Sequence, residues 1–594
     1  MKYYQQNLPT PDLRRNKFDL SYRKCFTTDM GKLIPVLCDE VVSRDYIELG
    51  NEMLIRLQPL AGVLMHEVDV FVDYFFVPYR ILWSQWEQFF AGNPATPAEP
   101  NPSPIAIPKF DTRQSNRRGL YSLWDYFGLP VDVSSLDQRA AIEPIDMPWR
   151  AYGMIYDEYY RDQDLQSSSF NNVDSYPVLP MNRNWQKDYF TTGRPFQTKG
   201  PAPALPVNVS FGDYTGVQWL SSFLYGKNSA TTMPFEFRST NHSGIQDMTN
   251  SQLTQLAGHS SDSGAAYQFS PTNSIPRSSV SQGVLPGNNA VNQIVVGLGL
   301  NDGWNQPDDP HTIAVSMAQI ASILGANMTL TASSFDISDL RLAVQTTLWL
   351  ERNARGGTRY TEILLNHFGH APRDERLQRP EYIGGTKNPL IISEILQTSE
   401  TATTPQGTMT GHGMTAIGQH VGTYHVEEPG LVMGLMSVMP KPCYQDGINR
   451  QWLRDDPIDF YWPEFAHLSE QGIIQAEIRW RGTPATGFAN TDAILFGYTG
   501  QYDEMRVKHD MVCTEMRKLQ AENIANDQLS YWNMSRKFTS FQSLNSTFIT
   551  CNPRKDIFLV NDVPGVIVDF KNVFYATRPM PAFAIPGLMD HTYS

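Results

Sequence analysis

The sequence predicts a mainly β fold, an antiparallel sandwich of the Greek-key or jelly-roll kind whose loops carry long, partly helical insertions. Strand-like segments occur near both ends of the chain, so the strands that pair come from distant parts of the sequence. The 41 glycines and 41 prolines place much of the chain in turns and loops rather than in long helices. Hydrophobic residues make up 41% of the 594, enough for a large core, and we expect a single domain over residues 1–594.

The clearest strand covers residues 66–78. Apolar and charged side chains alternate along it, which is typical of a strand with one face in a core, and Pro78 ends the pattern. Shorter runs predict strands over residues 472–480, 493–498 and 565–570. The predicted core face of the first strand consists of Val68, Val70, Val72, Tyr74 and Phe76.

Helices are predicted between these strands. The first covers residues 79–90, and a second begins after Ser338 as its cap and ends at Gly356. A third, short helix covers residues 361–368, with Gly369 in the position that favours a left-handed residue after a helix. The apolar stripes are formed by Leu82, Trp86, Phe89 and Phe90 in the first helix and by Leu340, Val344, Thr347 and Leu348 in the second.

Two segments are loops by composition. Residues 93–108 contain six prolines, which makes this segment stiff and extended. Residues 229–292 contain 12 serines and only five charged side chains, with no persistent period of a strand or helix. A segment of this length without a core is either disordered or a projecting functional loop, and we expect a variable surface insertion.

Both ends of the chain are predicted to form arms. The N-terminal arm, residues 1–30, is basic, which either a solvated arm or contact with DNA explains. The C-terminal arm, residues 578–594, is rich in proline, which rules out a helix or a central strand, and its apolar side chains need a neighbouring surface, most simply another subunit. The DNA-contact candidates are Arg14, Arg15, Lys17, Arg23 and Lys24, and the inter-subunit candidates are Arg578, Pro579, Pro581, Pro586 and Leu588.

Catalytic and metal-binding chemistry is not predicted, and we expect no cofactor. The five cysteines are odd in number and lack the paired spacing of a metal site, which favours a reducing compartment without disulfides. No nucleophile elbow or phosphate-binding loop occurs, and no apolar segment is long enough for a secretory signal or a membrane span. One cluster could ligate a metal, but its spacing fits loop or interface side chains better: His412, His420, His425, Glu427 and Glu428.

Short blocks of sequence run through the chain in a fixed order: Phe18-Asp-Leu-Ser21, Gly31-Lys-Leu-Ile-Pro35, Phe75-Phe-Val-Pro-Tyr-Arg80, Leu82-Trp-Ser-Gln-Trp86, Gly356-Gly-Thr-Arg-Tyr360, Arg379-Pro-Glu-Tyr-Ile-Gly-Gly385, Glu428-Pro-Gly430 and the proline-rich end from Arg578 to His591. In order and extent they resemble the major capsid proteins of the Microviridae, the small single-stranded-DNA bacteriophages, and most closely the gokushovirus-like branch. The resemblance covers roughly residues 14–225 and 335–591 and leaves one insertion between them.

The resemblance implies an eight-stranded antiparallel jelly-roll β-sandwich that assembles, in sixty copies, into a T=1 icosahedral shell around a circular single-stranded DNA genome. It also implies surface protrusions near the threefold axes, built by the insertion, and a host cell-surface receptor. Further expected partners are a small basic packaging protein and pilot or minor virion proteins, since a net charge of −14 cannot neutralise a genome. The protein would be made in the host cytoplasm and reside in the virion.

An alternative function remains open from the residues alone. A cytoplasmic jelly-roll protein that binds carbohydrate or cleaves glycans would also be rich in aromatic side chains, which stack on sugars. Its two catalytic carboxylates need not be close in sequence, so the absence of a motif does not exclude it.

Overall fold

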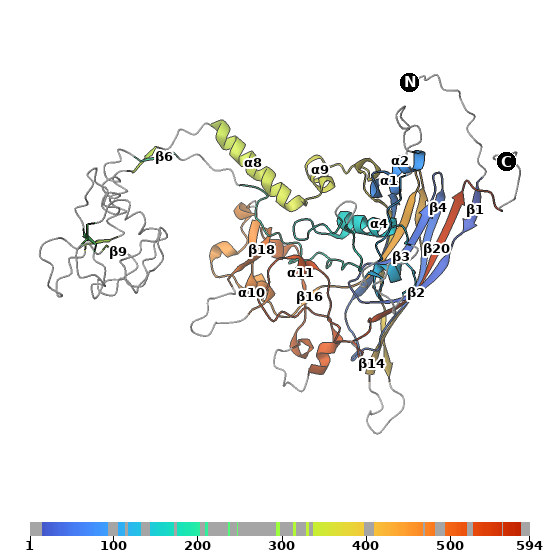
Figure 1. Cartoon of the computed structure of the whole chain (residues 1–594). Helices are drawn as coiled ribbons and strands as arrows, with labels where there is room; N and C mark the ends of the chain where they lie inside the picture. Colours follow the sequence, from blue (N-terminus) through green and yellow to red (C-terminus); the bar gives the residue numbers. More distant parts are fainter. Residues whose placement is uncertain are drawn as a thin grey trace, which may run out of the picture. The chain divides into compact units, whose positions relative to one another are not determined.

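The computed structural model describes residues 15–92, 105–112, 117–131, 143–170, 175–201, 337–396, 409–466, 468, 470–480, 493–518, 527–560 and 562–583, with six short strands between residues 208 and 331. The chain divides into two compact units. The first consists of Met1–Pro201 and Leu348–Ser594, and the second of Ala202–Thr347. Figure 1 shows the elements in sequence colours.

The larger sheet of the first unit is antiparallel, with the strand order β1-β20-β4-β14-β13, and β2 also pairs with β20. β1 and β2 occupy successive parts of the same edge of β20, because Asp19 lies opposite Tyr575 and Tyr22 lies opposite Asn572. The first and last described strands are therefore neighbours (Figure 1). The strands are β1 (Asn16–Asp19), β2 (Tyr22–Thr28), β4 (Tyr46–Leu57), β13 (Ile392–Leu396), β14 (Met409–His425) and β20 (Val566–Arg578).

The second sheet is also antiparallel and has the order β12-β5-β15-β3. Its strands are β3 (Ile34–Val41), β5 (Val68–Pro78), β12 (Glu381–Pro389) and β15 (Gly430–Pro440). Every residue of β15 is buried, as expected for a central strand covered on both faces. The predicted strand over residues 66–78 is confirmed as β5, and the one over 565–570 as the start of β20.

A hydrophobic core fills the space between the two sheets. It combines alternate residues of β4 and β20 from the first sheet with alternate residues of β3, β5 and β15 from the second. The predicted core face of β5 is confirmed, since each of its members is at most 1% exposed: Val68, Val70, Val72, Tyr74 and Phe76.

Helices cover the outer face of the second sheet. The opposite face of β5, with Phe75 and Val77, contacts Trp149 and Tyr152 of α4 within a second hydrophobic cluster. The predicted single helix over residues 79–90 is wrong in its continuity, because Trp83 has an extended backbone that separates two short helices. The helices are α1 (Tyr79–Leu82), α2 (Trp86–Ala91), α3 (Leu123–Tyr126), α4 (Met147–Ile155) and the π-helix η2 (Tyr156–Tyr160).

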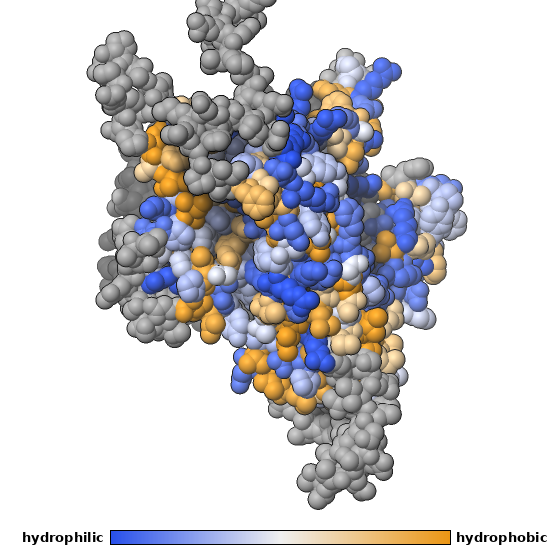
Figure 2. Space-filling view, turned by 90° about the vertical axis from the view of Figure 1, so that its right-hand side faces the viewer, coloured by the Kyte–Doolittle hydropathy of each residue, from blue (hydrophilic) through white to orange (hydrophobic). Residues whose placement is uncertain are grey.

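The outer face of the first sheet is exposed. Along β20, inward residues are buried, whereas outward residues such as Ile567 remain accessible. Figure 2 views the molecule from the side of β1 and shows hydrophilic and hydrophobic side chains mixed over this surface. The two faces of the sandwich therefore differ: helices cover one of them, and the other presents strands.

The connection from β15 to β20 builds a smaller lobe with its own aromatic cluster around Phe190, Tyr444 and Phe548. The strand predicted over residues 472–480 is only half correct, since β17 ends at Ile474 and a short helix follows. The strand over 493–498 is confirmed as β18. The lobe contains β16 (Cys443–Tyr444), β17 (Glu470–Ile474), β18 (Leu495–Gly500), β19 (Asp510–Met511), α10 (Gln475–Ile478), α11 (Ser546–Ile549) and the 3-10 turns η4 (Arg450–Trp452), η5 (Pro457–Asp459), η6 (Pro463–Phe465), η7 (Asp503–Met505), η8 (Thr514–Met516) and η9 (Asp527–Trp532).

Two helices precede β12, and both were predicted, but Ser338 lies inside the first turn of the first helix rather than before it as its cap. They are α8 (Ile337–Gly356) and α9 (Tyr360–Phe368), followed by the 3-10 turn η3 (Glu375–Leu377). Gly369 ends α9 with φ 67°, and its N–H donates to the carbonyl of Leu365 at 2.9 Å, so the predicted helix end is confirmed. None of the described helices combines the length and apolar composition that crossing a bilayer requires.

The described part of the second unit consists of three antiparallel strand pairs and of residues 337–347, the first part of α8. Most of the predicted loop over residues 229–292 lies outside the described residues, as does most of the proline-rich segment 93–108. The pairs are β6 (Asn208–Phe211) with β11 (Met328–Thr331), β7 (Glu236–Phe237) with β8 (Gln246–Asp247), and β9 (Gln293–Val296) with β10 (Ile313–Ser316).

Candidate subunit and nucleic-acid interfaces

The N-terminal cations divide between the two faces of the first sheet. Residues that are opposite one another in a sheet share a face, and Lys17 and Arg23 lie opposite the outward residues Thr577 and Lys571. Arg15 is exposed just before β1, and Arg14 lies outside the described residues. The structure thus brings Lys17 and Arg23 to one surface.

Both outward cations already have carboxylate partners. The Lys17 Nζ lies 2.8 Å from a Glu48 carboxylate oxygen and 4.7 Å from the centre of the Tyr575 ring. The Arg23 guanidinium lies 3.2 Å from Asp569. Such exposed pairs are weak, and a phosphate can compete for the cation. The surface therefore offers cationic contacts without a strong local excess of positive charge.

Lys24 points the other way, because it lies opposite the core residue Phe570. Its ammonium donates to the backbone carbonyl of Pro35 at 2.8 Å and to that of Tyr126. Burial lowers the pKa of Lys24 to about 8. The side chain links β2 to β3 and α3, and it is directed away from the surface that carries Arg23.

The C-terminal arm starts from an anchored residue. Arg578, the last residue of β20, donates to the buried carboxylate of Asp45 at 2.9 Å and to the carbonyl of Glu40 at 2.6 Å. Burial raises the pKa of Asp45, while the N–H of Val42 and the guanidinium of Arg578 oppose that shift. The anchor therefore supplies the positive charge that a buried carboxylate needs.

Beyond Arg578 the arm is held once more and then becomes exposed. The Asn16 side chain donates to the carbonyl of Met580 at 2.7 Å. Met580 is 47% exposed and Phe583 is 79% exposed. Pro579 is half-buried and Pro581 is exposed, whereas Pro586 and Leu588 lie outside the described residues. The described part of the arm presents large apolar side chains to solvent beside β1.

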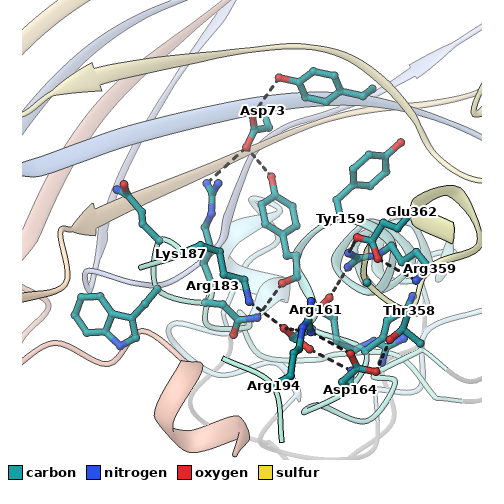
Figure 3. A pocket seen from close by; sticks show the side chains of 18 of the residues that line it. Asp73, Tyr159, Arg161, Asp164, Arg183, Lys187, Arg194, Thr358, Arg359 and Glu362 are labelled. Atoms are coloured by element: carbon teal, nitrogen blue, oxygen red, sulfur yellow. Dashed lines mark hydrogen bonds and ion pairs between the residues drawn. The ribbon is translucent and has the colours of Figure 1, made fainter. Parts of the chain in front are cut away.

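A polar cavity of about 440 Å³ lies where the sandwich meets its connections. Figure 3 shows charged side chains from several segments converging on it. Arg194 lies 3.0 Å from Asp164 and 3.7 Å from Asp162, and Lys187 lies 3.0 Å from Asp162. Arg359, after α8, pairs with Glu362 of α9 at 3.0 Å. We call this set of ion pairs the ionic junction.

The ionic junction also reaches the sandwich through Asp73 of β5. Its carboxylate accepts from the Tyr160 hydroxyl at 2.8 Å and lies 3.6 Å from the Arg183 guanidinium. Burial alone would raise the pKa of Asp162, but Lys187 and Arg194 lower it below its ordinary value. Each charge inside the ionic junction is therefore compensated, which is the condition under which buried charges are tolerated.

The described members of the suspected histidine cluster do not form a metal site. His420 and His425 belong to β14 rather than to a loop, and the side chain of His412 lies outside the description. Glu428 instead binds Arg80 through both carboxylate oxygens, at 3.1 and 2.9 Å. Among the residues that the structure describes, no group of three or more His, Cys, Asp or Glu side chains could hold a metal ion.

Sequence reasoning missed two features. The ionic junction draws on segments that are far apart in the chain, although two of the quoted blocks, around Arg359 and Tyr382, line its cavity. The second feature is an exposed aromatic segment in the lobe after β15, which includes Trp452 and Trp462. The density of aromatic residues between 452 and 462 was the available signal.

A two-sheet antiparallel sandwich whose C-terminal arm exposes Met580 and Phe583 has the features of a structural subunit that contacts neighbours. The chain belongs to the capsid protein (F protein) family, whose model matches residues 6–588. The predicted membership among Microviridae capsid proteins is confirmed, and the protein is a structural component of the virion that forms a shell. This decides against the carbohydrate-binding alternative.

Three relatives align along almost the whole chain, and each is described as capsid protein VP1. The protein of Chlamydia phage 1 is 32% identical over 621 residues, which cover 99% of this chain and 98% of the relative. The protein of Bdellovibrio phage phiMH2K is 29% identical, with 98% and 96% covered. The protein of Spiroplasma virus 4 is 27% identical, with 97% and 95% covered.

Substituting Asp164→Asn tests the ionic junction. The Asp164 side chain is only 7% exposed and serves both Arg194 and Lys199, so we expect the loss of its charge to lower the free energy of unfolding by about 3 kcal/mol. The control is Glu48→Gln in the exposed pair with Lys17, where the expected loss is below about 1 kcal/mol. Urea unfolding of the unassembled chain measures both, and equal losses would contradict the assignment.

Lys24→Met tests the buried ammonium. The pKa of Lys24 falls from its ordinary value of 10.5 to about 8, so above pH 8 the unfolded chain binds more protons than the folded one. The contribution of Lys24 to the free energy of unfolding therefore rises with pH until the pKa of Lys24 in the unfolded chain is reached. As pH rises from about 8 to 10.5, the thermal midpoint of the wild type should therefore rise relative to that of the variant.

Proposed function

We propose that this chain forms a T=1 shell of sixty copies around a circular single-stranded DNA genome, and that its sandwich is an eight-stranded jelly roll. The strand orders support the jelly roll: with β2, β3, β4, β5, β12, β14, β15 and β20 numbered one to eight, the sheets read 1-8-3-6 and 2-7-4-5. This interleaving is the arrangement of two Greek keys. The long connections after β5 and β15 are its partly helical insertions.

The observation that carries the shell proposal is the C-terminal arm. It is fixed at Arg578 but exposes Met580 and Phe583. An apolar, proline-rich segment cannot bury itself in a helix, and its prolines reduce the entropy lost when it binds a neighbour. We therefore place residues 579–594 against an adjacent subunit.

Contact with the genome is proposed for the N-terminal segment. Arg15, Lys17 and Arg23 are exposed on or beside one sheet face, and Arg14 precedes them in sequence. Lys24 is left out of this group because backbone carbonyls already engage its ammonium. A net charge of −14 per chain requires a basic packaging protein or polyamines as well.

The remaining roles rest on the sequence. We propose that residues 229–292 face outward and contribute to host attachment, since their small polar side chains are easily kept in water. A receptor on the host surface and minor or pilot proteins of the virion would then be further partners. Synthesis in the host cytoplasm and the lack of catalytic residues belong to the same proposal.

Deleting residues 579–594 tests the role of the arm. This truncation keeps Arg578, so the buried charge of Asp45 stays compensated and the subunit should retain its urea midpoint. Particle yield, counted by electron microscopy with the other virion proteins present, should fall at least about tenfold, because a loss of about 1.4 kcal/mol weakens each single contact tenfold. The full-length variant Met580→Ser with Phe583→Ser should share the defect. Normal yield from both would refute the proposed contact.

Replacing Arg14, Arg15, Lys17 and Arg23 by Gln tests the DNA contact. Each lost phosphate contact should reduce the slope of log affinity against log salt by about 0.7 for a single strand. The control is Lys571→Gln, which lies on the same sheet face and pairs with Glu52 at 2.9 Å. Filter binding over a salt series gives the slopes. An unchanged slope in the fourfold variant would show that the arm is solvated and does not contact DNA.

A further inference from the structure

The lobe after β15 exposes an unusual density of aromatic side chains. Residues 450–466, which we call the aromatic knob, are exposed without interruption from Asp455 to Glu464. Solvated aromatic groups of this size mark interaction sites when they lie together. Its large apolar members, with their exposed fractions, are Trp452 75%, Ile458 65%, Phe460 52%, Tyr461 52% and Trp462 47%.

The aromatic knob is held in one conformation by its base. Arg450 pairs with the buried Glu477 at 3.1 Å, and Arg454 pairs with the buried Glu504 at 3.2 Å. The Tyr502 hydroxyl donates to the carbonyl of Phe460 at 3.2 Å. A surface that is already ordered loses little entropy when it binds, which favours affinity.

The solvent-exposed surface of the aromatic knob is also acidic. Its two arginines are engaged by the buried glutamates, so their charge is not available to a partner. The exposed charged side chains of the knob are all carboxylates: Asp455, Asp456, Asp459 and Glu464. A partner surface should therefore combine apolar side chains with positive charge.

The same chain carries such a surface on the end of α8, on α9 and on η3. We call it the hairpin surface, residues 348–376. Four arginines are exposed on it, of which Arg355 already pairs with Glu470, against the one exposed carboxylate, Glu375, among the described residues of this segment. The arginines are Arg352, Arg355, Arg373 and Arg376, and the exposed apolar side chains are Leu348 52%, Trp349 54%, Tyr360 64%, Leu365 54% and Phe368 77%.

We propose that the aromatic knob of one copy binds the hairpin surface of a second copy, head to tail. This rests on the proposed shell and names a pair of surfaces that build it. In one copy the two surfaces are neighbours, since Arg355 pairs with Glu470 of β17 and Arg450 donates to the carbonyl of Gly472 at 2.6 Å. A head-to-tail contact builds a ring when the rotation between successive copies closes, as a closed shell requires.

Charge reversal on each surface tests the pairing. The knob variant carries Asp455→Lys and Glu464→Lys, and the hairpin variant carries Arg373→Glu and Arg376→Glu. Each should lower particle yield at least about tenfold through like-charge contact, while a chain with all four changes should assemble to within about threefold of wild type. Trp452→Ser should lower the yield without changing the urea midpoint.

The matched control reverses exposed carboxylates elsewhere, Glu515→Lys with Asp562→Lys, and should assemble normally. The pairing is overturned if the single-surface variants assemble as wild type, or if the fourfold variant assembles no better than they do. If the knob variant forms otherwise normal particles that lack another virion protein, the pairing is also overturned, because the knob would then bind that protein. Failure of the wild-type chain to form any particle would instead refute the shell itself.

Discussion

The fold depends on the pairing of β20 with β4. The last strand lies inside the first sheet, with β1 and β2 on one edge and β4 on the other. It contributes buried residues such as Phe570 and Phe574 to the core between the sheets. Without it, β1 and β2 would lose the strand with which they pair, and β4, β14 and β13 would remain as a separate sheet. Closing such a contact between distant parts of the sequence is slow and becomes possible only when the end of the chain is present.

Local patterns in the sequence predicted local structure well. Alternation in β5 identified its core face, and the glycines at 356 and 369 marked the ends of α8 and α9, because these features depend on near neighbours alone. The strand predicted over residues 472–480 failed for a different reason. Glu477 accepts the N–H of Ile474 and pairs with Arg450, and this distant cation stabilises a helical turn among strand-forming residues.

The surfaces were predicted less well than the core. Which face of β2 carries Arg23 and which carries Lys24 is set by the register with β20, more than 500 residues away. No pattern within residues 1–30 contains that information. The ionic junction depends on long-range pairing in the same way, whereas the aromatic knob is one continuous segment that its local density of aromatic residues could have indicated.

The pairing of β1, the first described strand, with β20, the last, has a practical consequence. Asn16 lies opposite Arg578, so the described chain begins and stops at the same corner of the sandwich. A peptide joined directly to Asn16 or to Arg578 would start from that corner, and a short linker between these two residues could close the strands into a circularly permuted subunit without the two arms. New ends would then be opened in an exposed connection, which leaves β20 in its central place in the sheet.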